Sequence, residues 1–160
     1  MRLLIAAVGR LKQGPERDLF RHYLGRTEMA GSKLGLAPVT LIEVPESRGP
    51  TPAARTAAEA MMMLGKVPPS HKLVCLDRHG DELRSAEFAA AISKFRDSGV
   101  TGLAFLIGGA EGLAPEILIR ADLKLSLGPM TLPHGLARIV LAEQLYRTAT
   151  ILAGHPYHRA

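Results

Sequence analysis

Residues 102–113 read GLAFLIGGAEGL, and this stretch decides the fold class. Its first half, residues 102–107, is an apolar run of strand length, and its second half carries three glycines. Apolar runs without polar alternation are typical of strands that are buried on both faces of a parallel sheet. Glycine permits positive φ and lets a ligand approach the main chain closely. We therefore predict a buried strand followed by a loop that binds a ligand through its backbone.

Strand-like and helix-like segments alternate on both sides of this stretch. Thr51 and Ser85 each precede a helical pattern, where a hydroxyl side chain can cap the first turn. This alternation predicts an α/β fold with a mainly parallel sheet covered by helices on both faces. The expected strands are 2–9, 39–44, 72–77, 102–107 and 123–127, and the expected helices are 15–33, 52–66, 85–96, 115–121 and 133–152.

Length and composition favour one domain spanning residues 1–160. Hydrophobic residues make up 47% and charged residues 22% of the 160 residues, which is ordinary for a folded globular chain. We see no linker, internal repeat or low-complexity tract that would separate a second domain. The formal net charge is +5, and the basic residues are scattered. Nucleic acid is a natural partner for such a chain, and it would meet a folded surface and not a basic arm.

The single cysteine, Cys75, excludes a disulfide within one chain and favours a cytoplasmic location. Cys75 lies in an apolar run, so we expect a core residue and not a nucleophile. The apolar start of the chain is interrupted by Arg10 and is too short for a secretory signal. No stretch approaches the roughly eighteen apolar residues of a membrane span.

A second unusual loop follows the last expected strand. Residues 125–134 read LSLGPMTLPH, and Pro129 and Pro133 make this segment stiff. Such a loop can clasp a flat heteroaromatic ring such as adenine between apolar side chains, with main-chain amides reading its edge. An ordinary loop packed on the core remains an alternative. The glycine spacing differs from the dinucleotide fingerprint, and no P-loop pattern is present, so an NTPase is disfavoured.

The last expected helix and the tail after it add two further predictions. The helix is apolar most of the way round, so we expect a second subunit to cover it in a homodimer. The tail, residues 155–159, reads HPYHR and concentrates side chains that bond, stack or carry charge. A frayed terminus is the alternative. No Cys cluster or His-Glu-x-x-His pattern accompanies these histidines, and we expect no metal.

These segments together resemble the ribosomal RNA large-subunit methyltransferase H family. The resemblance rests on residues 106–113, on 126–138 (SLGPMTLPHGLAR), on 143–147 (EQLYR) and on 155–158 (HPYH), in that order. Residues 8–12 (VGRLK) and 43–46 (EVPE) also match early segments of the family, so the likeness covers essentially the whole chain. It implies the SPOUT fold with a C-terminal trefoil knot. It also implies a homodimer that uses S-adenosylmethionine to methylate N3 of a pseudouridine in a hairpin of 23S ribosomal RNA.

The resemblance also assigns site residues. It places Leu76, Gly109, Gly128, Pro129, Met130, Thr131, Leu132 and Pro133 around S-adenosylmethionine. It places Tyr157, His158 and Arg159 near the substrate, reaching toward the partner subunit's pocket. The chain departs from the family at Ala110, where Pro is frequent, at Gly128, where Ser is common, and at Gly135, where a larger residue is usual.

The chemistry of methyl transfer to an imide nitrogen suggests roles for a few side chains. Removing the imide proton suits a group that titrates near neutrality, so His134 and His158 are the candidates for the base. Arg138 or Arg159 would steady the anion that develops on the carbonyls of the base. The scattered arginines and lysines would contact ribosomal RNA phosphates, and recognition is expected to need an assembled ribosomal particle.

Three other functions remain compatible with the sequence. One is a knotted enzyme that methylates a ribose 2′-hydroxyl, and another is a ribosome-associated binding protein without chemistry. The third is a nicotinamide-dependent oxidoreductase on a Rossmann sheet, which the late position and spacing of the glycine loop disfavour.

Overall fold

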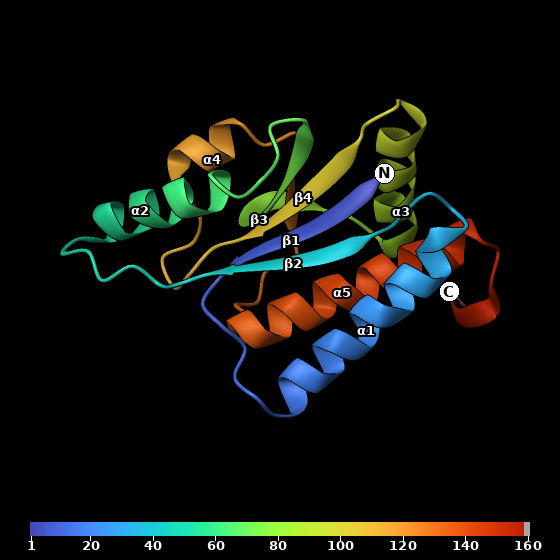
Figure 1. Ribbon diagram of the computed structural model, residues 1–160, viewed down its shortest axis with the longest axis horizontal. Coiled ribbons are helices and arrows are strands. Elements are labelled where there is room, and N and C mark those ends of the chain that lie inside the picture. The colour runs from blue at the N-terminus through green and yellow to red at the C-terminus, as the bar shows by residue number, and fades with distance from the viewer. Residues whose placement is uncertain (159–160) are drawn as a thin grey trace.

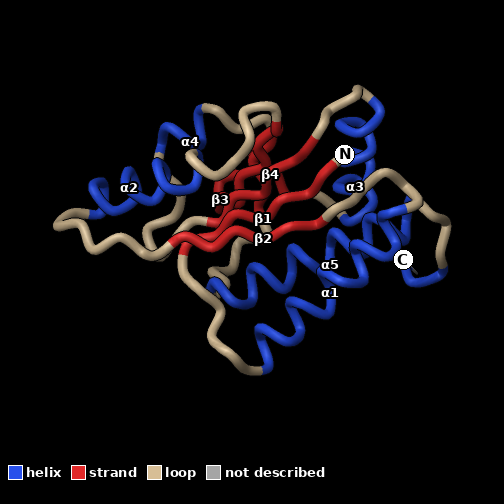
Figure 2. Tube along the Cα trace, in the orientation of Figure 1, coloured by secondary structure: helices blue, strands red, loops and turns tan. Residues whose placement is uncertain are grey.

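A five-stranded parallel sheet forms the centre of the computed structural model, which describes residues 1–158 (Figures 1 and 2). The strand order is β2-β1-β4-β3-β5, and each neighbouring pair is parallel. The α/β fold predicted from the sequence is therefore confirmed. The strands are β1 (Arg2–Val8), β2 (Val39–Val44), β3 (His71–Glu82), β4 (Gly102–Ile107) and β5 (Leu123–Ser126).

Helices cover both faces of the sheet (Figure 1). One layer contains α1 (Pro15–Ser32), α3 (Ser85–Asp97) and α5 (His134–Leu152), and the other contains α2 (Pro52–Leu64) and α4 (Pro115–Ile119). A short 3-10 turn, η1 (Pro156–His158), follows α5. Within the part of the chain that the structure describes, no helix is long and apolar enough to cross a membrane.

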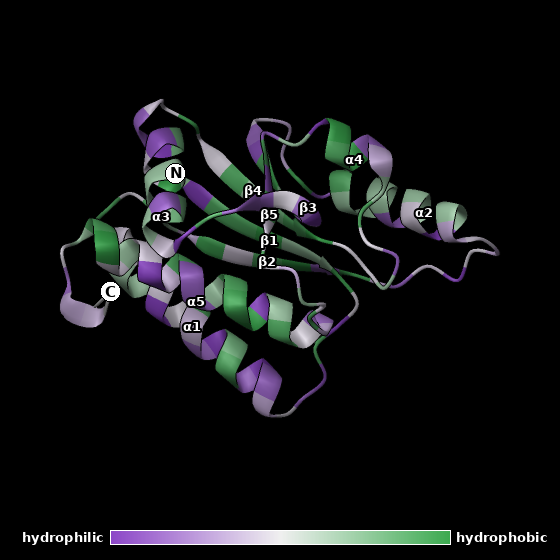
Figure 3. Ribbon diagram, turned by 180° about the vertical axis from the view of Figure 1, so that it is seen from behind, coloured by the Kyte–Doolittle hydropathy of each residue, from purple (hydrophilic) through white to green (hydrophobic). Residues whose placement is uncertain are grey.

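The uninterrupted apolar strands follow from this double cover. Along β1, Leu3 and Ile5 face the core under α1, α3 and α5, whereas Leu4 and Ala6 face the core under α2 and α4. Both faces of the strand are therefore buried, and no polar alternation survives (Figure 3). Cys75 lies in the second core, and burial raises the pKa of its thiol to about 12, which confirms that it is a core residue.

Two local expectations are wrong. The strand expected to end at residue 77 continues to Glu82, because it bulges between Leu76 and Asp81 and both residues pair with Leu125 of β5. Gly80 makes the bulge possible, since a Cβ there would lie 2.6 Å from the carbonyl carbon of Lys124. Ser85 does not cap α3; its hydroxyl donates instead to Gln144 of α5, at 2.8 Å. Thr51, in contrast, caps α2 as predicted, by accepting from the Ala54 N–H at 3.1 Å.

The parallel arrangement places the carboxyl ends of all five strands at one edge of the sheet. The loops that follow the strands gather there, and α5 also begins there, at His134. A 19-residue helix is about 28 Å long, so α5 ends at the opposite edge of the sheet, beside the C-terminus (Figure 1). The trefoil knot implied by the resemblance stays a prediction.

Candidate cofactor and catalytic site

The three segments predicted to hold the cofactor lie on adjacent strands. Leu76 is in β3, where it pairs with Leu125 of β5. Gly109 follows the end of β4 by two residues, and Gly128 follows the end of β5 by two residues. Because β3 lies between β4 and β5, the two glycine loops are separated by only two strand spacings, about 10 Å. A single ligand can therefore span all three segments.

The loop after β4 is a tight turn. The Gly112 N–H donates to the Gly109 carbonyl at 3.0 Å, and Gly112 has φ +79°. Gly108 packs directly against the backbone of Gly112, where a Cβ would collide. Ala110 occupies the first central position of this turn, a position that favours proline. The geometry explains why proline is frequent in the family at this position and why alanine is tolerated.

Helix α2 fixes this turn to the loop after β2, residues 45–51. Arg55 forms an ion pair with Glu111 of the turn at 2.6 Å and donates to the Gly49 carbonyl at 3.1 Å. Glu59, one helical turn further along α2, accepts from the Ser47 N–H at 2.9 Å and lies beside Gly109. Neither Arg55 nor Glu59 was predicted from the sequence as a residue that holds this loop. The only signal for Glu59 in the sequence was its position as a single carboxylate on an Ala- and Met-rich helix face, which is buried in the fold.

The loop after β5 is held by its own backbone and by one hydroxyl. Gly128 has φ +108°, in the left-handed region that favours glycine, and its N–H donates to the Ser126 hydroxyl at 3.2 Å. Ser126 thus provides a hydroxyl in the loop although position 128 lacks one. Leu127 and Gly128 line a cavity of about 340 Å³ between β5, the start of α3 and α5, and Met130 is 79% exposed.

His134 and Arg138 face a second, larger cavity of about 660 Å³ under the loop after β1. Arg138 is only 1% exposed and donates to Glu43 at 2.8 Å, to the Val8 carbonyl at 2.6 Å and to the Gly9 carbonyl at 2.9 Å. Burial lowers the pKa of Arg138, and the neighbouring Glu43 carboxylate opposes this shift. These contacts give Arg138 a structural role, and its action on a substrate anion stays a prediction.

Gly135 is explained by the neighbouring helix. A Cβ at Gly135 would collide with the Glu16 carboxylate, which lies over the first turn of α5. The acidic group therefore occupies the space of the larger side chain that is usual in the family, and it lies where the helix dipole favours negative charge.

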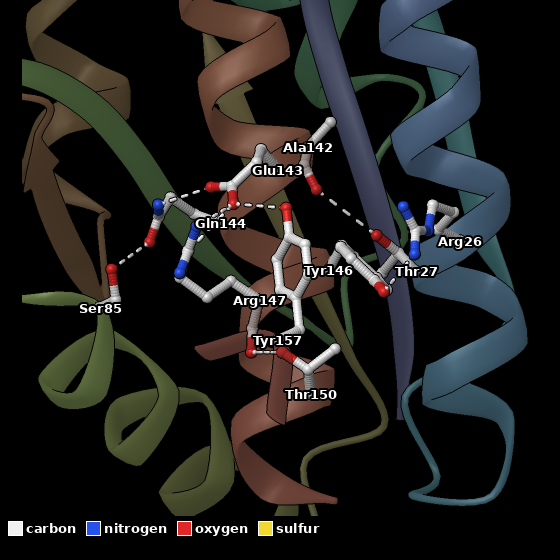
Figure 4. Close-up of polar contacts among 10 residues, drawn as sticks. All are labelled: Arg26, Thr27, Ser85, Ala142, Glu143, Gln144, Tyr146, Arg147, Thr150 and Tyr157. Atoms are coloured by element: carbon white, nitrogen blue, oxygen red, sulfur yellow. Dashed lines mark hydrogen bonds and ion pairs between the residues drawn. The ribbon is translucent and has the colours of Figure 1, made fainter. Parts of the chain in front are cut away.

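The tail folds back on α5 (Figure 4). The Tyr157 hydroxyl donates to Glu143 at 3.2 Å, its ring centroid lies 4.6 Å from that of Tyr146, and the Arg147 guanidinium lies 5.0 Å from the Tyr157 ring. Burial raises the pKa of Tyr157 to about 12, and the Glu143 carboxylate adds to the shift. Only the backbone of His158 is described, and Arg159 lies outside the described residues.

The catalytic candidates are therefore not brought together within one chain. His134 is at the start of α5, whereas Tyr157 docks on Glu143 and Tyr146, about 14–18 Å further along the helix axis. The cofactor candidates are at the same sheet edge as His134, at the ends of β3, β4 and β5.

Comparison with known proteins identifies the family of the chain. A family model described as "Predicted SPOUT methyltransferase" matches residues 1–158. The chain is 51% identical to a ribosomal RNA large subunit methyltransferase H from Bradyrhizobium sp. (strain ORS 278), and the match covers 100% of this chain and 99% of the relative. The chain belongs to the ribosomal RNA large subunit methyltransferase H family of SPOUT methyltransferases.

Other members of the family show the same similarity. Relatives of the same name from Rhodopseudomonas palustris (strain ATCC BAA-98 / CGA009) and Xanthobacter autotrophicus (strain ATCC BAA-1158 / Py2) are 51% and 49% identical, each over 100% of both chains. A crystal structure of a probable methyltransferase from Bordetella pertussis Tohama I superposes with a TM-score of 0.49 at 15% identity, over 92% of this chain and 95% of that one. The family predicted from the sequence is confirmed by the full-length relatives.

Proposed function

We propose that this chain is an S-adenosylmethionine-dependent methyltransferase that modifies N3 of a pseudouridine in a 23S ribosomal RNA hairpin. The observation that carries the proposal is the placement of Leu76 before the bulge of β3, between the loops after β4 and β5 that contain Gly109 and Gly128. The full-length similarity to relatives named as ribosomal RNA large subunit methyltransferases supports the substrate class.

The residues at this edge fit S-adenosylmethionine. Gly109 and Gly128 offer bare backbone, and the segment Pro129–Pro133 is a stiff loop whose Met130 side chain is free to cover a ring. When bound, the cofactor supplies a methyl group that its sulfonium already activates, so the protein needs no metal for this step. We assign Leu76, Gly109, Gly128, Pro129, Met130, Thr131, Leu132 and Pro133 to cofactor binding.

Residues near the pseudouridine position the reacting atoms, accept the imide proton and stabilise the charge that develops. Holding the reacting atoms in line contributes roughly 7–11 kcal/mol to lowering the barrier. His134 or His158 accepts the imide proton, directly or through water, which contributes about 10²–10⁴ in rate. Arg159 or Arg138 stabilises the negative charge on the carbonyls of the nucleobase. Tyr157, in the tail, lies near the substrate.

A homodimer completes this site, with the tail of one subunit serving the pocket of the other. The position of Tyr157 on Glu143, about 14 Å along α5 from His134, supports this arrangement, since the chain's own tail does not dock beside its own His134. Leu19 of α1 and Leu136 of α5 remain 45% and 43% exposed at neighbouring turns, which offers a contact face. Helices α1 and α3 already cover much of α5, so its apolar composition supports the dimer less than its sequence suggested.

The substrate is presented on an assembled ribosomal particle in the cytoplasm. The scattered basic residues and the net charge of +5 support binding to RNA phosphates, with affinity that falls as salt rises. A hairpin loop suits the reaction, because its unstacked bases can be turned into a pocket.

Primer extension on ribosomal RNA tests the proposal. A methyl group on N3 blocks base pairing, so reverse transcriptase stops at the modified position. The stop should appear in cells with the gene, vanish on deletion and return with the wild-type chain but not with Gly109→Val. An unchanged stop pattern on deletion would contradict the proposal. A methyl group found on the ribose would mean that the enzyme modifies a 2′-hydroxyl and not N3 of the base.

A further inference from the structure

Glu59 is a buried carboxylate without a cationic partner among the side chains that the structure describes. It is 5% exposed and is the only acidic side chain among the buried polar residues of the described region. The buried cation Arg138 pairs with Glu43, but across residues 1–157 no lysine, arginine or histidine forms an ion pair with Glu59. Buried charges are almost always paired, because desolvation is costly. This exception points to a cation from outside the chain.

The carboxylate lies where a ligand at the strand ends would meet it. Its Oε1 accepts from the Ser47 N–H at 2.9 Å, and a Cβ built at Gly109 would lie 3.1 Å from its Oε2. The carboxylate is therefore beside the backbone of the turn after β4, on the far side of β3 from Gly128. The bond to Ser47 alone does not explain the charge, since a neutral glutamine would accept the same hydrogen bond.

Neighbouring groups do not neutralise it either. Arg55, one helical turn away, is already bound to Glu111 and to the Gly49 carbonyl. The ligand that the proposed function brings to this edge carries an ammonium group at its amino acid end. If the stiff loop after β5 holds the adenine, the amino acid end extends across β3 toward β4, where Glu59 lies.

We propose that Glu59 binds the α-ammonium group of the cofactor and that Gly109 is bare because this group passes over it. The inference rests on the proposed function and adds to it a charge-recognising residue. Glu59 acts as a binding residue, and its contribution is specific to the ammonium group of the ligand.

The test compares two ligands by calorimetry on the full-length protein. The first is S-adenosylhomocysteine, and the second is its des-amino analogue, in which hydrogen replaces the ammonium group. Wild-type protein should bind the first about 10- to 100-fold more tightly, as expected for a hydrogen bond between charged groups. In Glu59→Gln this preference should shrink to less than about threefold. The variant should bind S-adenosylhomocysteine more weakly, whereas its affinity for the analogue should stay at the wild-type level. The control Glu116→Gln removes an exposed carboxylate of α4 and should keep the full preference.

Each other result has a distinct meaning. Equal weakening of both ligands in Glu59→Gln would show that Glu59 only shapes the turn, and it would overturn the inference. A wild-type protein that binds both ligands equally would overturn it too, even if Glu59→Gln does not fold. Binding of neither ligand by the wild type would remove the proposed function as well. Glu59→Asp keeps the charge on a shorter side chain and should retain part of the preference.

Discussion

Ala110 occupies the first central position of the Gly109–Gly112 turn, where a fixed φ lowers the entropy of the unfolded chain. We expect Ala110→Pro to stabilise the protein by about 0.4–1 kcal/mol, because Ala110 takes the first central position of a hydrogen-bonded turn, a position at which proline is favoured. Calorimetry should show a rise in melting temperature of roughly 1–4 °C. A lower melting temperature would mean that proline removes a hydrogen bond of the Ala110 N–H or forces Gly109 out of its conformation.

Arg138 gives a second prediction for a single residue. Arg138→Ala leaves the Glu43 carboxylate and two carbonyls without their partner, so we expect a loss of about 3 kcal/mol in the free energy of unfolding. Arg10→Ala, at the exposed rim of the same cavity, should change stability by less than about 0.5 kcal/mol. Urea denaturation measures both. Unchanged stability of Arg138→Ala with abolished methyl transfer would make Arg138 a catalytic residue and not a structural one.

The sequence predicted the residue types at the strand ends but not the residues that hold them. Gly109 and Gly128 could be recognised in the sequence, because glycine after a strand indicates positive φ or close approach of a ligand to the backbone. Glu59 and Arg55 do not stand out, because the partners that give them meaning come from loops after β2 and β4. The burial of Arg138 and its bonds to Glu43 and to the loop after β1 were not predicted, because they are tertiary contacts, and its catalytic role stays a prediction.

At the scale of elements, the docking of η1 on α5 depends on the protonation of one phenol. Tyr157 has its pKa raised to about 12, so its hydroxyl is favoured in the neutral form in the folded state. The stabilisation from this contact is fully present below pH 10, the ordinary pKa of tyrosine, and is lost as pH rises toward 12. Absorbance titration of the three tyrosines should therefore show one late component.

Tyr157→Phe should remove that late component. If the late component persists in Tyr157→Phe, another tyrosine carries it, and the tail does not dock on Glu143 in solution.

Element boundaries were predictable where apolar periodicity and caps agree, as in β2, β4 and the start of α2. The end of β3 was not, because the segment Asp77–Asp81 has the composition of a turn. Pairing of Asp81 with Leu125 extends the strand past the bulge, and this pairing is a tertiary contact with no local signal. Ser85 failed as a cap for a similar reason, since Gln144 of α5 takes its hydroxyl.

At the scale of the whole molecule, the separation of about 14 Å along α5 between His134 and the residue on which the tail docks, Glu143, predicts that each site is shared between subunits. Co-expression of Gly109→Val with a variant truncated after Gly154 should restore methyl transfer, because one site of the mixed dimer has both intact parts. Random mixing makes about half of the dimers mixed, and one of the two sites in each is intact, so about a quarter of all sites are active. Each variant alone should be inactive, and doubly tagged purification isolates the mixed dimer.

No recovery in the mixed dimer would place the tail and the loops of one site on the same chain. This prediction came from the family resemblance alone, because chain length, charge and periodicity carry no information about where the tail docks on α5. The contacts of Tyr157 with Glu143 and Tyr146 supply that information in the fold.

In the proposed function, Leu76 of β3 and the loops after β4 and β5 form one cofactor site. A crystal structure with S-adenosylhomocysteine tests it most directly. The account predicts the adenine against residues 127–133, with backbone contacts at Leu76 and Gly109. Ligand found instead in the larger cavity beside Arg10 and His134, with the two glycine loops empty, would contradict it.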